Sequence, residues 1–423
     1  MKKSSPKNKR PLNIAILSRA AHPFHNYGGL ERHIYYQAKH LARLGCNIIL
    51  ITEPPAPGCM QKLDGVFKEK GRVDVKFVSR RPLPLPRRGG FIILDRLINY
   101  LFSAKAMVET IRQDAEAGRF DCVIAHGLTG WAAGRMLRKI PNKPKLMLNP
   151  HGMEEFKHTN IIKKILYYPF RRKMASAARD ADMVVATDKI MIPQVRECLK
   201  VGDEKIVMLP NAIDVEEALG YVSVKIQKDL RERFGLKKGE LMLASVGRLE
   251  ANKGHLNLIN QMARIKDKIK KPWKLIIVGK GSQRLKLETA IAETGLQDRI
   301  ILAGTLNDAE LHNLYELADI FVLPSLFEGS SIATLEAMIH KCAIIANAVG
   351  GLPDKVQPGI NGFLCDTVNL DEIGDAIFKI GNESSFIITL MCEKSSDYVR
   401  NFFSWQCVVQ KLFNFCKSNE LLS

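Results

Sequence analysis

The stretch Leu323–Met338, with the sequence LPSLFEGSSIATLEAM, places Glu328 on an expected loop and Glu336 on the helix that follows this loop. The apolar run 321–323 indicates a buried strand, and residues 332–338 have helical spacing. Glu328 therefore follows the carboxyl end of a strand, the edge where ligands bind in open α/β sheets. A carboxylate on the loop and one on the helix can each hold the vicinal hydroxyls of a sugar. Two solvated surface acids are the alternative interpretation.

A second stretch, Ala244–His255, with the sequence ASVGRLEANKGH, carries two cations between an expected strand and an expected helix. The strand ends at Gly247 and the helix begins near Gly254, with Arg248 and Lys253 between them. An arginine offers a planar fork for phosphate oxygens, a lysine offers a point charge, and a helix N-terminus adds partial positive charge. The stretch predicts a diphosphate clamp, with two ordinary surface cations as the alternative.

Apolar runs with strand character alternate with helical patterns twice along the chain. This alternation predicts two doubly wound α/β domains, one over 13–214 and one over 225–395. The basic, polar composition of the first residues predicts a disordered arm over residues 1–12. A last helix is expected over about 400–418. The expected strands are 13–18, 48–51, 73–78, 122–125, 146–148 and 183–186 in the first domain, and 241–246, 274–278, 300–303, 320–323 and 343–346 in the second.

Together the two stretches resemble the retaining, nucleotide-sugar-dependent glycosyltransferases of family 4 (GT4), which have the two-domain GT-B fold. The resemblance covers nearly the whole chain and takes in four further segments: Asn26–Arg32, Ile124–Gly127, Leu209–Asp214 and Gly350–Asp354. It implies two Rossmann-like domains that face a central crevice, with the donor bound mainly by the second and the acceptor by the first. It also implies that the last helix crosses back and completes the N-terminal domain.

In the first domain, the resemblance gives roles to two glycines and two histidines. Gly28 and Gly29 match a loop whose backbone can approach the donor phosphates, because no side chain intervenes. His126 matches the active-site histidine near the transferred sugar. His151 is a second strand-end histidine, expected on the acceptor side of the site.

In the second domain, the resemblance implies a reaction that leaves the anomeric configuration unchanged. Arg248 and Lys253 would stabilise charge on the departing diphosphate, an electrostatic role. Glu328 would contact hydroxyls of the donor sugar, and Glu336 would contact the ribose. The expected catalytic residues are therefore His126, Arg248, Lys253 and Glu328.

One segment departs from the family pattern. Ser330, Ser331 and Ile332 stand where members commonly have Phe-Gly-Leu or Phe-Gly-Ile, so Ser331 takes the glycine position. The amides of these three residues are still expected to bind the donor phosphates. Asp354 also replaces a more usual glutamate. Because of these departures the identity of the donor stays open, whereas the predicted class of enzyme does not change.

No metal or cofactor is expected besides the nucleotide-sugar substrate, because the cations of the clamp supply the charge stabilisation. The single Asp-x-Asp, Asp180–Asp182, lies at a helix-to-strand junction far from the clamp in the sequence. The nine cysteines include no Cys-x-x-Cys pair, which favours reduced thiols in a cytosolic compartment and argues against a structural metal.

The net charge of +19 calls for an anionic partner or environment. Residues 80–93 and 161–173 mix cations with apolar side chains, which suits an anionic bilayer surface, whereas solvated faces over the core are the alternative. The apolar run Leu12–Leu17 is too short for a signal peptide or a membrane span. We expect a cytoplasmic protein, peripheral at the inner face of the cytoplasmic membrane, with a lipid-linked or lipopolysaccharide-type glycan as acceptor.

Three other functions are alternatives to this hypothesis. A nucleotide-sugar epimerase or hydrolase of the same fold would use the same clamp without an acceptor. A non-enzymatic basic protein would bind nucleic acid or membrane through charge, but no recognised nucleic-acid motif accompanies the cations, so no nucleic-acid partner is expected. A NAD-type oxidoreductase is disfavoured because no Gly-x-Gly-x-x-Gly follows the first expected strand.

Overall fold

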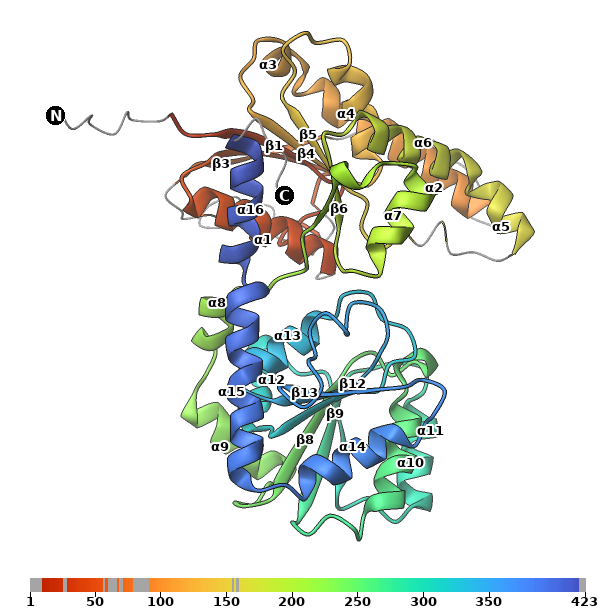
Figure 1. Cartoon of the computed structure of the whole chain (residues 1–423), viewed down its shortest axis with the longest axis vertical. Helices are drawn as coiled ribbons and strands as arrows, with labels where there is room; N and C mark the ends of the chain where they lie inside the picture. The colour runs from red at the N-terminus through yellow and green to blue at the C-terminus, as the bar shows by residue number, and fades with distance from the viewer. Residues whose placement is uncertain are drawn as a thin grey trace, which may run out of the picture. The chain divides into compact units, whose positions relative to one another are not determined.

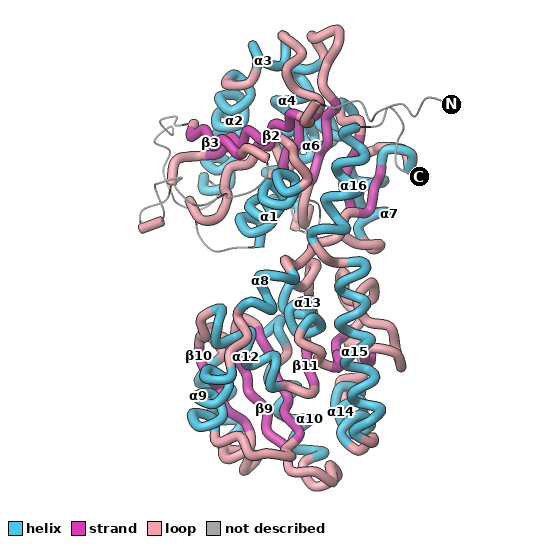
Figure 2. Tube along the Cα trace, turned by 90° about the vertical axis from the view of Figure 1, so that its left-hand side faces the viewer, coloured by secondary structure: helices cyan, strands magenta, loops and turns pink. Residues whose placement is uncertain are grey.

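The computed structural model describes residues 10–25, 29–55, 58–59, 67, 71–78, 91–153, 156 and 160–417, with side chains from residue 97 onward in the helix that begins at Phe91. The chain forms two compact units (Figure 1). The first comprises Met1–Leu209 and Val408–Ser423, and the second comprises Pro210–Cys407. Each unit is an α/β structure with strands inside and helices outside (Figure 2).

The first unit contains, in its described residues, a seven-stranded parallel sheet in the order β3-β2-β1-β4-β5-β6-β7. Strands such as β4 and β6 are buried at every residue, as expected for a parallel sheet that helices cover on both faces. The strand order reverses between β1 and β4, and ligands of such sheets bind beyond the carboxyl ends at this point. The strands are β1 Asn13–Leu17, β2 Asn47–Thr52, β3 Val73–Phe77, β4 Cys122–His126, β5 Lys145–Asn149, β6 Met183–Ala186 and β7 Ile206–Met208.

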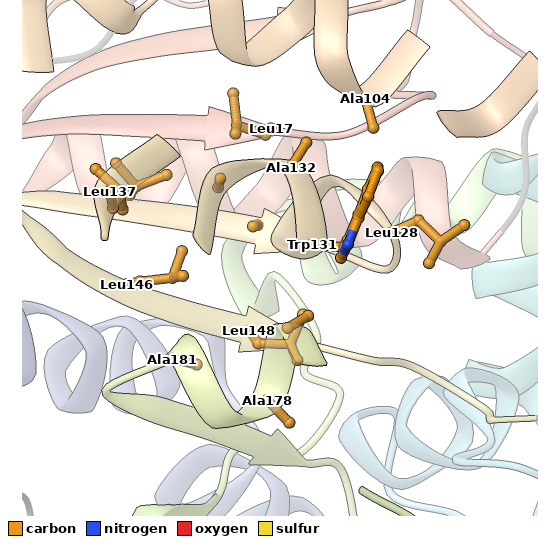
Figure 3. Close-up of a cluster of buried hydrophobic side chains, with 14 of the residues drawn as sticks. Leu17, Ala104, Leu128, Trp131, Ala132, Leu137, Leu146, Leu148, Ala178 and Ala181 are labelled. Atoms are coloured by element: carbon orange, nitrogen blue, oxygen red, sulfur yellow. The ribbon is translucent and has the colours of Figure 1, made fainter. Parts of the chain in front are cut away.

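The core of the first unit includes an apolar layer between the sheet and the helices. Figure 3 shows part of this layer, including Leu17 of β1, Trp131 of α4 and Leu148 of β5. Helix α4 packs closely on α6, because a Cβ on Gly134 would lie 2.6 Å from the Cβ of Asp180. The helices are α1 Gly29–Arg43, α2 Phe91–Glu109, α3 Arg112–Glu116, α4 Thr129–Leu137, α5 Ile161–Leu166, α6 Tyr168–Asp180, α7 Met191–Leu199 and, from Val408 on, α16 Trp405–Lys417.

The second unit contains a six-stranded parallel sheet in the order β10-β9-β8-β11-β12-β13. Apolar clusters cover both faces of this sheet. The strands are β8 Leu241–Val246, β9 Trp273–Val278, β10 Ile300–Gly304, β11 Ile320–Leu323, β12 Ala343–Asn347 and β13 Gly362–Cys365. The helices are α8 Val215–Gly220, α9 Val224–Phe234, α10 His255–Ile265, α11 Arg284–Glu293, α12 Asp308–Leu317, α13 Ile332–Ile339, α14 Glu372–Gly381 and α15 Ser385–Phe402.

The limits of the units differ from the expected domain limits. The first unit ends at Leu209 and not at residue 214, because the segment that follows pairs within the second unit. Ile213 donates its N–H to the carbonyl of Phe403 at 2.9 Å and accepts from the N–H of Trp405 at 3.1 Å. The second unit extends to Cys407 and not to 395, because α15 continues to Phe402 and packs on α13 and β12.

The last helix also differs from its expected range of about 400–418. Residues 400–402 belong to α15, and the chain turns at Phe403 and Ser404 before α16 begins at Trp405. The hydroxyl of Ser404 donates to the carbonyl of Arg400 and accepts from the N–H of Cys407, so it links the two helices. The expected arm lies outside the described residues up to residue 9, as does Gly28.

Candidate functional site

In the second unit, the loops that follow β8 and β11 lie against each other. Strand β8 ends at Val246, and a short 3-10 turn over Ala251–Lys253 leads to Gly254 and α10. Gly254 has a φ of 71°, and a Cβ there would clash with the carbonyl of Pro324 in the other loop. Glycine at this position therefore allows the two loops to approach at the carboxyl ends of neighbouring strands.

This approach brings together Lys253 and Glu328, two residues predicted for the site. The Nζ of Lys253 lies 2.7 Å from Oε2 of Glu328, and each side chain is 15 % exposed. A charge-assisted hydrogen bond of this length fixes both head groups and leaves remaining donor and acceptor positions for a ligand. Arg248, in the same loop, is exposed. The residues of the predicted diphosphate clamp and the first glutamate thus lie at one edge of the sheet.

The segment with the unusual serines caps helix α13. The Oγ of Ser331 accepts hydrogen bonds from the N–H of Thr334 at 3.2 Å and from its hydroxyl at 3.0 Å. Ser331 has a φ of −59°, so this position does not require the left-handed backbone that favours glycine. The serine therefore replaces the family's glycine without backbone strain. The first amides of α13, including that of Ile332, follow this cap.

A buried lysine that the sequence interpretation missed supports the same loop. Lys355 is 1 % exposed, and its Nζ donates to Oγ of Ser330 at 2.9 Å. The loop also packs against Gly350, which has a φ of 56°. A Cβ at this position would clash with the carbonyl of Glu328. The segment Gly350–Asp354 was quoted for the resemblance, but nothing in the sequence says that the lysine after it reaches Ser330.

Glu336 lies on α13 and is 5 % exposed. The hydroxyl of Tyr315, on α12, donates to its Oε2 at 3.3 Å. The second glutamate of the opening stretch is therefore a buried, hydrogen-bonded acid, whereas Glu328 is half-buried at the loop.

In the first unit, His126 and His151 meet at the carboxyl ends of β4 and β5. The Nδ1 of His126 lies 2.9 Å from Nε2 of His151, and its Nε2 lies 3.1 Å from the side-chain oxygen of Gln37 on α1. Because an amide oxygen only accepts, His126 donates from Nε2 and accepts at Nδ1 from the N–H of His151. Gln37 thereby sets the tautomer of the pair, a role that the sequence interpretation missed.

Both histidines are neutral near pH 7. Burial, followed by the neighbouring His151 and His33, holds the pKa of His126 well below its usual value. Burial, followed by His33, lowers the pKa of His151 to about 3. The pair can therefore accept or donate hydrogen bonds, but it does not supply positive charge at neutral pH.

A cavity of about 480 Å³ opens beside these histidines, within the first unit. Its walls include an ion pair that the sequence interpretation missed, with Nε of Arg19 2.8 Å from Oε1 of Glu53. The guanidinium of Arg19 lies 4.7 Å from the ring centroid of Tyr100, whose hydroxyl donates to the carbonyl of His126 at 3.0 Å. The cavity thus offers paired charges and an aromatic ring at the carboxyl ends of β1, β2 and β4. Of the predicted glycine pair, Gly29 begins α1 and is exposed.

The Asp-x-Asp has structural partners. Asp180 accepts from Arg138 at 2.9 Å, and Asp182 accepts from the N–H of Leu146 at 2.8 Å and from Lys143 at 3.4 Å. Within the described ranges, no three His, Cys, Asp or Glu side chains are grouped so that they could hold a metal ion. In the same part of the chain, no helix has the length and apolar character needed to cross a membrane.

Both units match sequence models of glycosyltransferase families. The sequence model of the family described as glycosyl transferases group 1 matches residues 226–400, and that of glycosyltransferase family 4 matches residues 27–217. An uncharacterized glycosyltransferase of Methanocaldococcus jannaschii is 27 % identical over 234 residues, which is 55 % of this chain and 59 % of the relative. The chain thus aligns with little more than half the length of that protein.

Two further proteins extend the comparison. The UDP-Gal:alpha-D-GlcNAc-diphosphoundecaprenol alpha-1,3-galactosyltransferase of Escherichia coli is 25 % identical over 68 % of this chain and 72 % of its own. The solved structure of sucrose-phosphate synthase from Thermosynechococcus elongatus superposes with a TM-score of 0.71 at 20 % identity, over 96 % of this chain and 98 % of the other. This likeness confirms the predicted fold class, two Rossmann-like α/β domains of the GT-B type.

Proposed function

Because the chain belongs to the group 1 glycosyltransferases of family 4, we propose that it transfers a sugar from a nucleotide-sugar donor to a glycan acceptor with retention of the anomeric configuration. The 2.7 Å contact between Lys253 and Glu328 is the observation that carries this proposal. It joins a cation suited to a diphosphate with a carboxylate suited to sugar hydroxyls. The E. coli relative is named for a UDP-sugar donor, which supports the same class of donor here.

The donor is held by the second unit in this proposal. Arg248 and Lys253 take the diphosphate oxygens and stabilise the negative charge that develops as the sugar leaves. The amides of Ser330, Ser331 and Ile332, which precede and open α13, add donors with partial positive charge. The hydrogen bond from Lys355 to Ser330 helps to keep this loop in place. Glu328 accepts from sugar hydroxyls, and Glu336 binds the ribose.

His126 acts as a neutral group in this proposal. Both of its ring nitrogens already have partners, Gln37 and His151, and its side chain is 2 % exposed. A direct contact between its ring and the sugar must therefore replace one of these hydrogen bonds. The acceptor occupies the cavity beside the histidines, where Arg19 and Glu53 offer a donor and an acceptor for hydroxyl groups.

We further propose that the acceptor is a lipid-linked or lipopolysaccharide-type glycan and that the protein binds the inner face of the cytoplasmic membrane. Helix α5 supports this, because Ile161, Ile162 and Ile165 are 68 %, 64 % and 66 % exposed beside exposed Lys163 and Lys164. The E. coli relative acts, by its name, on a diphosphoundecaprenol acceptor. Of the other segment, 80–93, residues 80–90 lie outside the described residues.

A panel of UDP-, GDP- and ADP-sugars, scored by thermal stabilisation of the purified protein, tests the donor assignment. The correct donor at a hundred times its dissociation constant is expected to add about 2.7 kcal/mol of stability. The Arg248→Ala/Lys253→Ala variant should lose this gain, whereas Lys237→Ala, an exposed lysine of the same unit, should keep it. Stabilisation of wild type and double variant alike would remove the clamp from the donor site.

Product analysis separates the transferase from the alternatives. A transferase consumes donor only when an acceptor is present, and its product keeps the anomeric configuration of the donor. Donor consumption without acceptor would indicate the epimerase or hydrolase. We expect activity to persist in EDTA, because the charge stabilisation comes from Arg248 and Lys253; loss in EDTA with recovery on adding Mg²⁺ or Mn²⁺ would contradict this.

A further inference from the structure

A second cavity of the first unit, of about 250 Å³, shares no lining residue with the cavity at the histidines. It lies among α2, α3, α4 and the residues after α4. The charged and aromatic side chains in its wall are Lys105, Glu109, Arg112, Trp131, Arg135 and Lys139. We call this cavity the Trp131 pocket.

Three cations gather on the indole ring of this pocket. The Nζ of Lys105, the Cζ of Arg135 and the Nζ of Lys173 lie 5.8, 5.3 and 4.2 Å from the ring centroid of Trp131. The side chain of Trp131 is 6 % exposed. An aromatic face attracts a cation only modestly, so one ring does not offset the mutual repulsion of three positive groups.

Among the described residues, three of the four cations in the wall of the Trp131 pocket have no acidic partner. The only carboxylate among the described residues that line it is that of Glu109, which forms an ion pair with Arg112 at 2.9 Å. Among the residues that the structure describes, Lys105, Arg135 and Lys139 make no ion pair. The repulsion is also visible at Lys173, whose pKa is lowered first by burial and then by Arg135, Lys105 and Arg172. The pocket therefore holds uncompensated positive charge.

We propose that the Trp131 pocket binds a phosphate group, carried either by an anionic lipid headgroup or by a free phosphorylated molecule. Arginine forks and lysine ammonium groups are the side chains that recognise phosphate oxygens. The volume lies below the range of about 300–1,000 Å³ that is usual for drug-sized ligands, so the pocket suits a phosphate and not a whole nucleotide-sugar. This site is separate from the donor clamp and does not rest on the proposed transferase activity.

The second unit offers a matched control. A cavity of about 360 Å³ there is also lined by lysines, including Lys237, Lys238 and Lys271. Its charge is partly offset, because the carboxylates of Asp319 and Glu240 lie in its wall. Replacing the three lysines by glutamine removes as much charge from the protein as the pocket variant does. We call Lys237→Gln/Lys238→Gln/Lys271→Gln the control triple variant.

The test uses the full chain carrying Arg248→Ala and Lys253→Ala, so that phosphate binding at the proposed donor clamp does not contribute to the signal. Inorganic pyrophosphate is titrated in one arm, and vesicles of phosphatidylglycerol or of phosphatidylcholine in the other. Binding at the pocket is measured by tryptophan fluorescence, as the part of the fluorescence change that is lost in a Trp131→Phe variant. The pocket variant, Lys105→Gln/Arg135→Gln/Lys139→Gln, is expected to bind at least about tenfold more weakly, because it loses charge-assisted hydrogen bonds. The control triple variant is expected to stay within about twofold of its parent.

The two arms distinguish the sources of the phosphate. Saturable pyrophosphate binding with a Trp131 signal supports a free phosphorylated ligand. Binding only to phosphatidylglycerol vesicles, lost in the pocket variant, supports a lipid headgroup. Absence of binding in both arms, or equal loss in the pocket and control variants, would overturn the proposal. So would a pocket variant that melts several degrees below the control, since it would show that these cations serve stability.

Discussion

At the scale of single residues, the ion pair joins Lys253, proposed to bind the diphosphate, with Glu328, proposed to bind the sugar hydroxyls. Each side chain is only 15 % exposed, so removing one leaves the other partly buried without its partner. The free-energy change of a single substitution therefore contains two contributions, the lost contact and the cost of leaving the partner unpaired. A double-mutant cycle over the two residues separates these contributions.

The clamp gives the first prediction at this scale. Arg248→Ala and Lys253→Ala should each lower transfer by about a hundredfold or more, the usual loss for one charge-stabilising group. Steady-state kinetics with the donor found in the panel checks this. Lys237→Ala controls for removing one positive charge from the same unit, and circular dichroism controls for folding. Wild-type turnover in either folded clamp variant would be incompatible with the assignment.

The buried histidines give a prediction about pH. The unfolded chain takes up protons near pH 6.5, whereas folded His151 and His255 do so only near pH 3 and pH 4. Protonation thus favours the unfolded state, and stability is lost as the pH falls below about 6.5. For each histidine the loss is up to about 1.4 kcal/mol per pH unit, until the folded pKa is reached.

Urea denaturation at pH 7, 6 and 5 measures this slope. His255 belongs to the second unit and His151 to the first, so His255→Gln and His151→Gln should each flatten the slope for their own unit. Both ring nitrogens of His255 are buried and, within the part of the chain that the structure describes, have no hydrogen-bond partner. An unchanged slope in both variants would exclude these side chains as the source.

At the scale of elements, the N-terminus of α13 carries the departure from the family pattern. Ser331→Ala removes a cap and should cost about 1 kcal/mol of stability, whereas Ser331→Gly should cost only a few tenths. Because the first turn of α13 faces the proposed phosphates, Ser331→Ala should also weaken donor binding several-fold. Melting curves and calorimetric titration of the donor measure the two effects.

A second cap in the same unit supplies the control. The hydroxyl of Ser384 accepts from the N–H of Ile387 at the start of α15. Ser384→Ala should therefore cost a similar amount of stability and leave donor affinity unchanged. Equal loss of donor affinity in both alanine variants would show a general effect of destabilisation and not a local one at α13.

Elements also show how far the sequence could predict the structure. The long apolar strands follow from their patterns, and the eleven expected strands all have counterparts. Strands β7 and β13 were not expected, because both are edge strands with partly exposed residues and lack the fully buried apolar pattern of equally short strands such as β6. The residue pairs of the site are harder still: Gln37 with His126 and Lys355 with Ser330 are joined only by the fold. Helical and strand periodicity carry no information on such long-range contacts.

At the scale of the whole molecule, the cations behind the net charge of +19 differ in how free they are to meet a partner. Lys163, Lys164 and Arg172 are exposed on or near the apolar helix α5. Arg171 is half-buried, and its guanidinium donates to the carbonyl of Lys164. Of the cations in this segment, Arg171 is therefore tied to the protein backbone and is less free to meet a lipid headgroup.

This difference sharpens the membrane prediction. Replacing Lys163, Lys164 and Arg172 by serine should weaken binding to phosphatidylglycerol vesicles by up to about 3 kcal/mol, at about 1 kcal/mol for each cation near the surface. High salt should release much of the wild-type protein, because exposed charges are screened. Vesicle sedimentation measures both effects, with the control triple variant as reference. Equal sedimentation of all three proteins would favour a soluble acceptor.

The seam formed by Ile213, Phe403 and Trp405 places the two ends of the second unit side by side. The second unit is therefore an insertion in the chain of the first: its last residue, Cys407, is synthesised before residues 408–417, the part of α16 that belongs to the first unit. During translation, the later unit in the sequence can complete its fold before the earlier one. The surface of the first unit that α16 covers then stays open to solvent until that helix has left the ribosome.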